Sequence, residues 1–488
     1  MLAEEKKSLM FDSNGLIKVP ERFSKLAKLI QRDLNNLRDT PTFPLYKKEE
    51  IIKYLKNPYR HSKQLRKASI YLYGASPHYR RLIQYFVGLN DFAYVVSPYK
   101  LDTSTANPKR INKKYRKTLN MLSSMDIKNQ FPKILKVCFR EDVFYGHIIM
   151  TSDTVTIQRL PSDYCDIAVI EGNVLNVSFD FSYFDSHATY LDYYDEEFQI
   201  KYELYKKDRV RMRWQELDAP RSFAIKCNND ILDYPLPPFA GIFGEIYDLD
   251  EYKSLRKTKE VLQNYAVLVM QLGINSDGEW EMDLEKARDF YYNLANVLPE
   301  EVGAVLSPME INKISFERNH AGDTTTVADA ENNLFSAAGV SSLLFNNIKA
   351  SSNALLLAIK ADQMMTYDVV KSIEAALNRF VQSLSYGKNF KVTFLDTSPY
   401  NRESVGAQYL KACQYGLPMV TYYCASQGLS QAEMDGMTFL ENEVLELPYR
   451  FVPLQSGNTI SAGEDPGRPE SNPEDLTDDG EITKENED

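Results

Sequence analysis

The chain has 488 residues, about three times the length of a typical domain, so its length predicts two or three domains. Hydrophobic residues make up 43%, enough for sizeable cores, and the 22 Pro and 21 Gly exclude a fibrous or collagen-like protein. No apolar run reaches the roughly 20 residues that span a bilayer, and the start MLAEEKKSLMF lacks a signal-peptide core. We therefore expect a soluble, mostly globular, cytoplasmic protein.

The five cysteines are odd in number, scattered, and never spaced as CxxC. This usage favours a reducing compartment and excludes both a disulfide framework and a zinc site of that spacing. The residues are Cys138, Cys165, Cys227, Cys413 and Cys424.

The net charge of −11 is unevenly distributed. Residues 461–488 carry eleven Asp/Glu against two Lys/Arg and hardly any apolar side chain, so we expect this tail to be disordered. Residues 46–117 carry seventeen Lys/Arg against four Asp/Glu, a net of +13. Such a block is typical of a nucleic-acid-binding surface, and equally of a solvated face or a salt-bridged subunit contact.

Helical patterns fill the first quarter of the chain. They predict helices at 20–40, 47–57 and 60–72, a helix from the Ser76-Pro77 cap to Gly88, and a basic helix at 107–128. Residues 141–214 then alternate with period two and predict three hairpins with six strands, which implies an antiparallel sheet. The hairpins are DVFYGHIIM–TSD–TVTIQRL, DIAVI–EGN–VLNVSFDFSYF and FQIKYELY–KKD–RVRMRW, followed by the irregular connector 235–239.

Helices dominate the second half. Residues 245–272 contain neither Gly nor Pro and predict a helix about 40 Å long, with Val261, Tyr265, Leu268 and Leu272 on one face. A small mixed segment follows, with a helix near 283–297 and an alternating stretch at 302–317. Asp323 is the expected cap of the next helix, which Gly339 ends.

A polar loop separates that helix from the longest helical run. Ser351 or Ser352 is expected to cap this run, which continues to Gly387 and is about 50 Å long. Its later half places Val370, Ile373, Leu377, Val381 and Leu384 on one face. A strand at 390–396 and three short helices within 402–446 complete an α+β fold.

Sequence motifs of catalysis are missing: GxxxxGK[ST], GxGxxG, HExxH and GxSxG do not occur. The five histidines are far apart in sequence, and His147, within a predicted strand, is expected to be a hydrogen-bonded structural residue. The densest acidic run, 192–197 (DYYDEE), favours a solvated turn; the alternative is a metal-dependent nuclease or other DNA-binding enzyme that uses these carboxylates. We expect no enzyme activity, no catalytic residue, no metal and no cofactor.

Two segments carry a resemblance to a known family. The first is LFSAAGVSSLLFNN at 334–347, a helix end and a polar loop before a long helix. The second is YLKACQYGLPMVTYYCASQGLSQAEMDGMTFLENEVLEL at 409–447, and GRPE at 467–470 opens the acidic tail. Together with the element order, these segments resemble the portal proteins of tailed double-stranded DNA bacteriophages, of the type common in phages of Gram-positive hosts.

The resemblance implies a ring, usually of twelve subunits, at one capsid vertex. It divides the chain into a wing (1–244, helices then antiparallel sheet), a stem helix (245–273), a small αβ clip (274–316), a second stem helix (317–338), a tunnel loop (339–352), a long helix and strand returning to the wing (353–398), a helical crown (399–447) and a linker with the acidic tail (448–488).

The family forms the head–tail connector, the channel for DNA packaging and ejection. The implied partners are other copies of the chain, the major capsid protein, the scaffold, the terminase large subunit, the head-completion adaptor and double-stranded DNA passing non-specifically, with no membrane. The implied location is the portal vertex of the virion, and the host cytoplasm during assembly.

The tunnel loop is the expected DNA-facing site. Its candidate residues are Asn346, Asn347, Lys349, Ser351 and Ser352. Lys349 is the single charged residue between Leu334 and Lys360, and a ring of such residues would offer weak, sequence-independent phosphate contacts. The alternative is that Lys349 only solvates an exposed loop.

Overall fold

The computed structural model describes residues 45–151, 154–263, 266–271, 282–298, 302–307, 320–341, 344–345 and 351–450. The helix predicted at 20–40 and the acidic tail lie outside these ranges. The chain divides into two units, Met1–Ala432 and Glu433–Asp488. This division falls inside the segment predicted as a crown.

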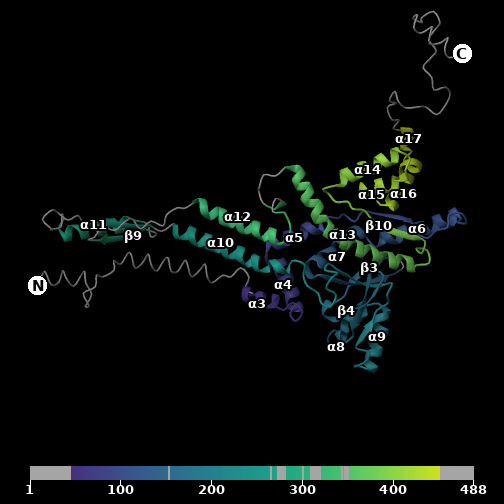
Figure 1. Ribbon diagram of the computed structural model, residues 1–488, viewed down its shortest axis with the longest axis horizontal. Coiled ribbons are helices and arrows are strands. Elements are labelled where there is room, and N and C mark those ends of the chain that lie inside the picture. The colour runs from purple at the N-terminus through teal and green to yellow at the C-terminus, as the bar shows by residue number, and fades with distance from the viewer. Residues whose placement is uncertain are drawn as a thin grey trace, which may run out of the picture. The chain divides into compact units, whose positions relative to one another are not determined.

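The elements of the first unit are shown in Figure 1. Its helices are α3 (Lys48–Leu55), α4 (Ser62–Ala75), α5 (Pro77–Val87), α6 (Pro108–Ser124), α7 (Ile127–Glu141), α8 (Tyr183–Ser186), α9 (Glu196–Lys207), α10 (Phe243–Gln263), α11 (Leu284–Val297), α12 (His320–Ala337), α13 (Ser352–Ser383), α14 (Arg402–Gln414) and α15 (Val420–Ser426). Its strands are β1 (Tyr94–Pro98), β2 (Val143–Met150), β3 (Val155–Arg159), β4 (Cys165–Glu171), β5 (Val174–Asp180), β6 (Trp214–Glu216), β7 (Ser222–Lys226), β8 (Ala266–Gln271), β9 (Val302–Ser307) and β10 (Phe390–Phe394).

The central sheet has six antiparallel strands in the order β3-β2-β7-β5-β4, with β6 paired to β5. Its two faces bury different cores, because successive side chains of a strand point to opposite faces. On β2, Phe144 and Ile148 join the core formed with α4, α5, α7 and α13, whereas Val143 and Tyr145 join the core formed with α8 and α9. The predicted antiparallel sheet and its first two hairpins are confirmed.

The third predicted hairpin is wrong, because FQIKYELY forms helix α9. Phe198 and Tyr205, seven residues apart, are both buried on one helical face, while Ile200 between them is exposed. Asp195 caps the helix, and its first and last turns carry acidic and basic residues respectively, which favours a helix over a strand. The sixth strand of the sheet is instead β7, which the alternation rule did not identify.

The predicted helices of the first quarter are confirmed as α3, α4, α5 and α6. Ser76 caps α5 by accepting a hydrogen bond from the Tyr79 amide. Helix α7, which the sequence pattern did not indicate, follows α6 and supplies Phe131, Leu135 and Phe139 to the larger core.

Helix α13 runs for 32 residues, about 48 Å, and ends at Ser383, four residues short of the predicted stop at Gly387. Its predicted apolar face is confirmed: Val370, Ile373, Leu377 and Val381 are buried. The chain then returns as β10, the predicted strand, which pairs antiparallel with β1. This pairing joins segments almost 300 residues apart.

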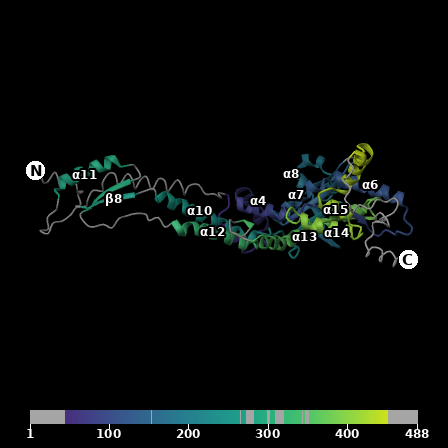
Figure 2. The ribbon, with the colours of Figure 1, turned by 90° about the horizontal axis from the view of Figure 1, so that it is seen from above.

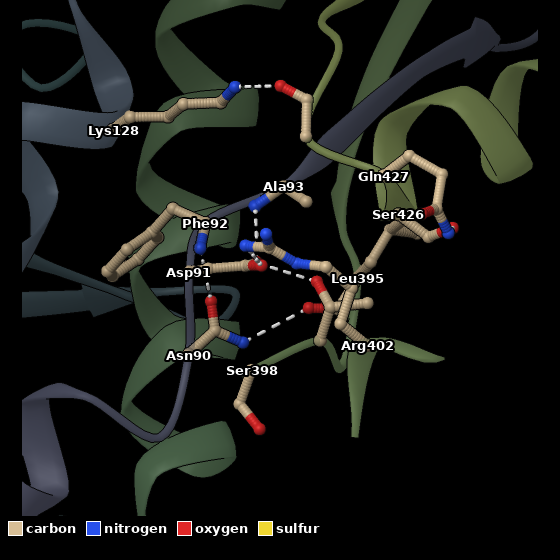
Figure 3. A network of polar contacts seen from close by, with 12 residues as sticks. Asn90, Asp91, Phe92, Ala93, Lys128, Leu395, Ser398, Arg402, Ser426 and Gln427 are labelled. Atoms are coloured by element: carbon tan, nitrogen blue, oxygen red, sulfur yellow. Dashed lines mark hydrogen bonds and ion pairs between the residues drawn. The ribbon is translucent and has the colours of Figure 1, made fainter. Parts of the chain in front are cut away.

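A polar network fixes the junction of β1, β10 and α14 (Figure 3). Asp91 accepts hydrogen bonds from the hydroxyl of Thr397 at 2.6 Å and from Arg402 at 2.9 Å. Asn90 donates to the carbonyl of Leu395 at 3.1 Å. These bonds hold α14 against the start of β1.

A second buried node holds the connector 235–239. Lys226 and Asp142, 1% and 0% exposed in their side chains, form an ion pair. Asp142 also accepts hydrogen bonds from the backbone amides of Asn228 and Leu236, both at 2.9 Å, and Lys226 donates to the carbonyl of Tyr234. The irregular connector predicted there is confirmed, and these bonds are its attachment to the sheet.

The predicted long helix at 245–272 ends early, at Gln263, and residues 266–271 form β8. The run AVLVMQ pairs in parallel with VGAVLS of β9, and α11 lies between the two strands in sequence, which makes a small β-α-β unit. Tertiary pairing of a β-branched run therefore outweighs its helical spacing. Tyr265 and Leu272 of the predicted stripe lie outside the described residues.

Helices α10 and α12 pack against each other, and both views show them side by side (Figures 1 and 2). Helix α12 begins at His320, so Asp323 is inside the helix and not its cap. The predicted helix near 283–297 is confirmed as α11, and only 302–307 of the alternating stretch is described, as β9.

The last predicted helices, within 402–446, are confirmed. Helices α14 and α15 belong to the first unit, and α16 (Gln431–Phe439) crosses the boundary between the units. The second unit continues with a π-helical turn, Leu440–Val444, and α17 (Leu447–Arg450).

Candidate functional site: the loop between α12 and α13

The end of α12 is a glycine-dependent stop. Gly339 has a φ of +76°, and the amides of Gly339 and Val340 donate to the carbonyls of Ser336 and Phe335 at 3.0 and 3.1 Å. This pair of bonds is a Schellman motif, which needs a left-handed residue directly after the helix. The predicted stop at Gly339 is confirmed, and it turns the chain into the loop at a defined angle.

An aromatic anchor holds the first half of the loop. The ring of Phe345 stacks on Phe335 of α12, with centroids 4.3 Å apart and planes 10° from parallel. Tyr85 of α5 meets the Phe345 ring edge-on at 5.3 Å, and the Arg81 guanidinium lies 5.6 Å from its centroid. The loop, α12 and α5 are therefore joined at the Phe345 side chain.

The far side of the loop begins α13. The hydroxyl of Ser351 accepts a hydrogen bond from the Ala354 amide at 3.3 Å, so of the two predicted caps, Ser351 and Ser352, Ser351 is the N-cap. The first turns of the helix expose apolar side chains: Leu357 and Met364 are 67% and 68% exposed. This face of α13 has no cover within the described chain, so its exposed apolar side chains are suited to contact another molecule.

A hydrogen bond ties α13 back to α5. The Tyr85 hydroxyl donates to the Asp362 carboxylate at 2.7 Å. Burial and the neighbouring carboxylate raise the pKa of Tyr85, so its hydroxyl keeps its proton and stays a donor. Tyr85 therefore contacts both the loop, at the anchor residue Phe345, and the third turn of α13, at Asp362.

The structure describes only part of the predicted site. Asn346, Asn347 and Lys349 lie outside the described residues. Ser351 is the N-cap of α13, and Ser352 is its first residue. The sequence argument missed Arg81 and Tyr85, which come from a helix some 260 residues away. The local signal was the apolar Leu-Phe pair inside the loop, because such side chains need a packing partner.

The acidic run 192–197 is divided: Asp192 lies in an exposed 3-10 turn, Ala188–Tyr193, as expected of a solvated turn, whereas Asp195–Glu197 form the start of α9. Asp195 is the N-cap, and its carboxylate faces His147 at 3.4 Å and Arg221 at 3.0 Å. Glu197 pairs with Lys201 within the helix. An open hollow of about 680 Å³ is lined by Asp195, Glu197, Lys201 and Arg221, and each of these two carboxylates has a basic partner there.

His147 is fully buried on β2 and hydrogen-bonds to Asp195, which confirms its predicted structural role. Burial lowers the pKa of His147, whereas the nearby carboxylates of Glu197 and Asp195 raise it. The effect of burial is the larger, so the pKa lies below its ordinary value. Partial burial opposes ionisation of Asp195, but the hydrogen bond from His147, the Glu196 amide and the Arg221 charge outweigh it and lower its pKa. At neutral pH this is therefore a neutral imidazole donating to a carboxylate.

Among the described residues, no group of three His, Cys, Asp or Glu is placed to hold a metal ion. The five cysteines are free thiols, and burial raises the pKa of Cys138 and Cys165, which makes them poor nucleophiles. In the part of the chain that the structure covers, no helix is both long and apolar enough to cross a bilayer.

The sequence matches no protein-family description and no curated protein. Its fold is similar to chains in three solved structures of gene transfer agent (GTA) particles. Each is 13% identical to this chain. The chain of "Neck of empty GTA particle computed with C6 symmetry" has a TM-score of 0.39, and the match covers 72% of this chain and 94% of that one. For "Virion of native gene transfer agent (GTA) particle" the TM-score is 0.40 and the coverages are 76% and 93%, and for "Neck of native GTA particle computed with C12 symmetry" the TM-score is 0.40 and the coverages are 74% and 94%.

Proposed function

We propose that the chain is a portal subunit, the head–tail connector of a tailed double-stranded DNA phage or a related particle. The observation that carries the proposal is the order of elements: α10, the β8-α11-β9 unit, α12, an anchored loop, and then the long helix α13. This order matches what the resemblance at 334–347 and 409–447 implies. Helices α10 and α12 would be the stem, and 339–351 the tunnel loop.

The structure changes one assignment within that proposal. Because the first long helix ends at Gln263, we place the start of the clip at β8 and not at 274. The clip then consists of a two-stranded parallel ladder and one helix. Helix α11 exposes Phe290 and Tyr292, 58% and 56%, and exposed aromatic residues are typical of protein interfaces. These two rings flank the buried Tyr291, and we propose that they contact the terminase large subunit and later the head-completion adaptor.

Charge supports a conduit. Each subunit has a net charge of −11, so a ring of twelve carries about −132 and holds no general attraction for DNA. Tight phosphate binding along the channel would stall translocation. Weak contacts at isolated basic points, such as a ring of Lys349, are compatible with movement.

The loop charge gives a specific prediction. Lys349→Glu should leave ring assembly intact and reduce DNA packaging or retention, because each ring would exchange twelve positive charges for twelve negative ones beside the DNA. Packaged genome per particle, measured by quantitative PCR after nuclease treatment, is the readout; Lys360→Glu, on α13, is the matched charge change. Equal packaging by Lys349→Glu and wild type would show that the loop charge has no role.

The proposed function is tested by removing the gene from the particle that encodes it. Without the chain, assembly should yield capsids that lack DNA, and the wild-type gene supplied in trans should restore filled heads. A tagged chain should label one vertex of each particle in electron micrographs. DNA-filled heads in its absence, or label spread over all vertices, would contradict the proposal.

A further inference from the structure

Helix α6 presents an unpaired basic face. From 103 to 125 the sequence contains six Lys/Arg and no Asp or Glu. Lys109, Lys113 and Lys117 recur every four residues and therefore share one side of the helix, and all three are exposed. The opposite side is buried through Leu119 and Leu122. The helix is thus amphipathic, with a polar face of cations, Asn and Ser and no acidic residue.

Other cations of the basic block at 46–117 are engaged. Lys48 and Arg66 form ion pairs with Asp248 and Asp163. Arg80 donates to backbone carbonyls, and Arg81 lies over the Phe345 ring. These contacts give structural roles to four of the eleven cations of the block outside α6.

The cations of α6 differ from them. Within the described chain, Lys109, Arg110, Lys113 and Lys117 form no ion pair and no cation–π contact. Because the chain as a whole is acidic, such a concentration of unneutralised positive charge is not explained by the subunit's own folding. It is suited to an external polyanion.

The composition of this face distinguishes nucleic acid from protein. Protein interfaces have an apolar, aromatic-rich centre and are depleted in Lys. Between 99 and 124 none of the described large hydrophobic side chains is exposed, and the neighbours of the cations are Asn112 and Asn120. Surfaces that hold a phosphate backbone are polar and cationic.

The dimensions also fit. Lys109 to Lys117 spans eight residues, about 12 Å along the helix. Each strand of double-stranded DNA carries one negative charge per roughly 3.4 Å of its axis, so a face of this length meets about four phosphates of one strand. We propose that the exposed face of α6 binds the phosphate backbone of double-stranded DNA without reading its sequence. The inference rests on the proposed function, which brings the chain to DNA, and it names a contact outside the tunnel loop.

The test compares two full-length variants with the same charge change. The first carries Lys109→Gln, Arg110→Gln, Lys113→Gln and Lys117→Gln; the control carries Lys206→Gln, Lys207→Gln, Arg209→Gln and Arg211→Gln, at the end of α9. Binding to a fluorescent 30-base-pair duplex of random sequence is followed by anisotropy between 50 and 200 mM salt. The α6 variant should bind about tenfold more weakly or worse, and its slope of log affinity against log salt should fall by about 3 to 4. The α9 control should bind as wild type.

Three outcomes would overturn the inference. First, the α6 variant could bind the DNA duplex with wild-type affinity. Second, the α9 control could lose as much affinity for DNA as the α6 variant, which would indicate a general charge effect. Polyglutamate of equal charge could compete with DNA at equal or lower concentration, which would identify α6 as a site for an acidic protein.

Failure of this inference is separable from failure of the proposed function. Both variants are imaged by negative stain, and both should form the assembly that wild type forms, because neither set of residues contributes to a buried core. Rings without α6-dependent DNA binding would refute the α6 contact alone. Salt-sensitive, α6-dependent binding by a protein that never forms rings would support the α6 contact and contradict the portal.

Discussion

The six-stranded sheet and the β8-α11-β9 unit use strands in opposite ways. The sheet is covered on both faces, and alternate residues of β2 enter two separate cores. The small unit has two parallel strands and one helix, and that helix leaves Phe290, Tyr292 and Val297 mostly exposed. A three-element unit cannot bury much apolar surface by itself. The sheet should therefore be stable within one chain. The stability of the small unit should instead depend on α10 and α12, which flank it in the chain, and on contacts with other molecules.

The largest expected effect is in the sheet-bearing core. Asp142→Ala leaves the Lys226 ammonium buried without its partner and removes the acceptor for two backbone amides. The free energy of unfolding should fall by about 3 to 5 kcal/mol, measured by urea denaturation. Asp368→Ala, which breaks an exposed pair with Lys371, is the control and should change it by less than about 0.5 kcal/mol. A loss below about 1 kcal/mol for Asp142→Ala would show that the node is not required.

The aromatic anchor Phe345, in the loop between α12 and α13, should give an intermediate effect. Phe345→Ala removes the ring that joins α12 to α5, at a cost of about 2 kcal/mol for a half-buried aromatic residue. Hydrogen exchange should speed up at the end of α12 and the start of α13, while β2 and β7 stay protected. Equal exchange in the variant and wild type at those two helix ends would mean that the anchor does not hold the loop.

The buried histidine predicts a dependence on pH. Because the folded pKa of His147 is below its ordinary value, the unfolded chain binds protons first as the pH falls through about 6.5. The free energy of unfolding should therefore decrease between pH 7 and pH 5. His78 shifts in the same direction, so His147→Gln should flatten this slope without abolishing it. An unchanged slope in His147→Gln would contradict the neutral, buried imidazole.

The smallest effect on stability is expected at the exposed aromatic residues of α11. Phe290→Ala and Tyr292→Ala should change the free energy of unfolding by less than about 0.5 kcal/mol, because both rings are exposed. Binding of a clip partner, measured by surface plasmon resonance with the terminase large subunit, should weaken at least tenfold. Tyr291→Ala is the internal comparison, since that ring is buried and its loss should lower stability. Unchanged affinity with Phe290→Ala and Tyr292→Ala would place the docking surface elsewhere.

The sequence predicted this fold where local signals agreed. The sequence identifies Ser76 as a cap and Gly339 as a stop, and it narrows the cap of α13 to Ser351 or Ser352, because these roles depend on a few neighbouring residues. The stripe of α13 was found because 3.6-residue periodicity persists over many turns. Local chemistry was therefore sufficient to place the start of α5 and the bounds of the loop.

Local patterns failed where two periods fit the same residues. FQIKYELY alternates, yet Phe198 and Tyr205 also lie on one face of a helix, and only the cap and the terminal charges decide. The run 266–271 could continue α10, and its pairing with β9 about 30 residues later decides against that. Helix α7 carries Pro132 in its interior, which obscured it. The support of the loop by Tyr85 and Arg81 depends on tertiary contacts that spacing cannot show.

The central claim is that copies of this chain close into a ring around a channel. The most direct test is the native mass of the purified full-length protein together with negative-stain images of the same sample, prepared with and without divalent cations and double-stranded DNA. Rings with a central hole, at about twelve times the 56.1 kDa subunit mass, are the predicted result. A monomer that cleaves the DNA when a divalent cation is present would contradict the account.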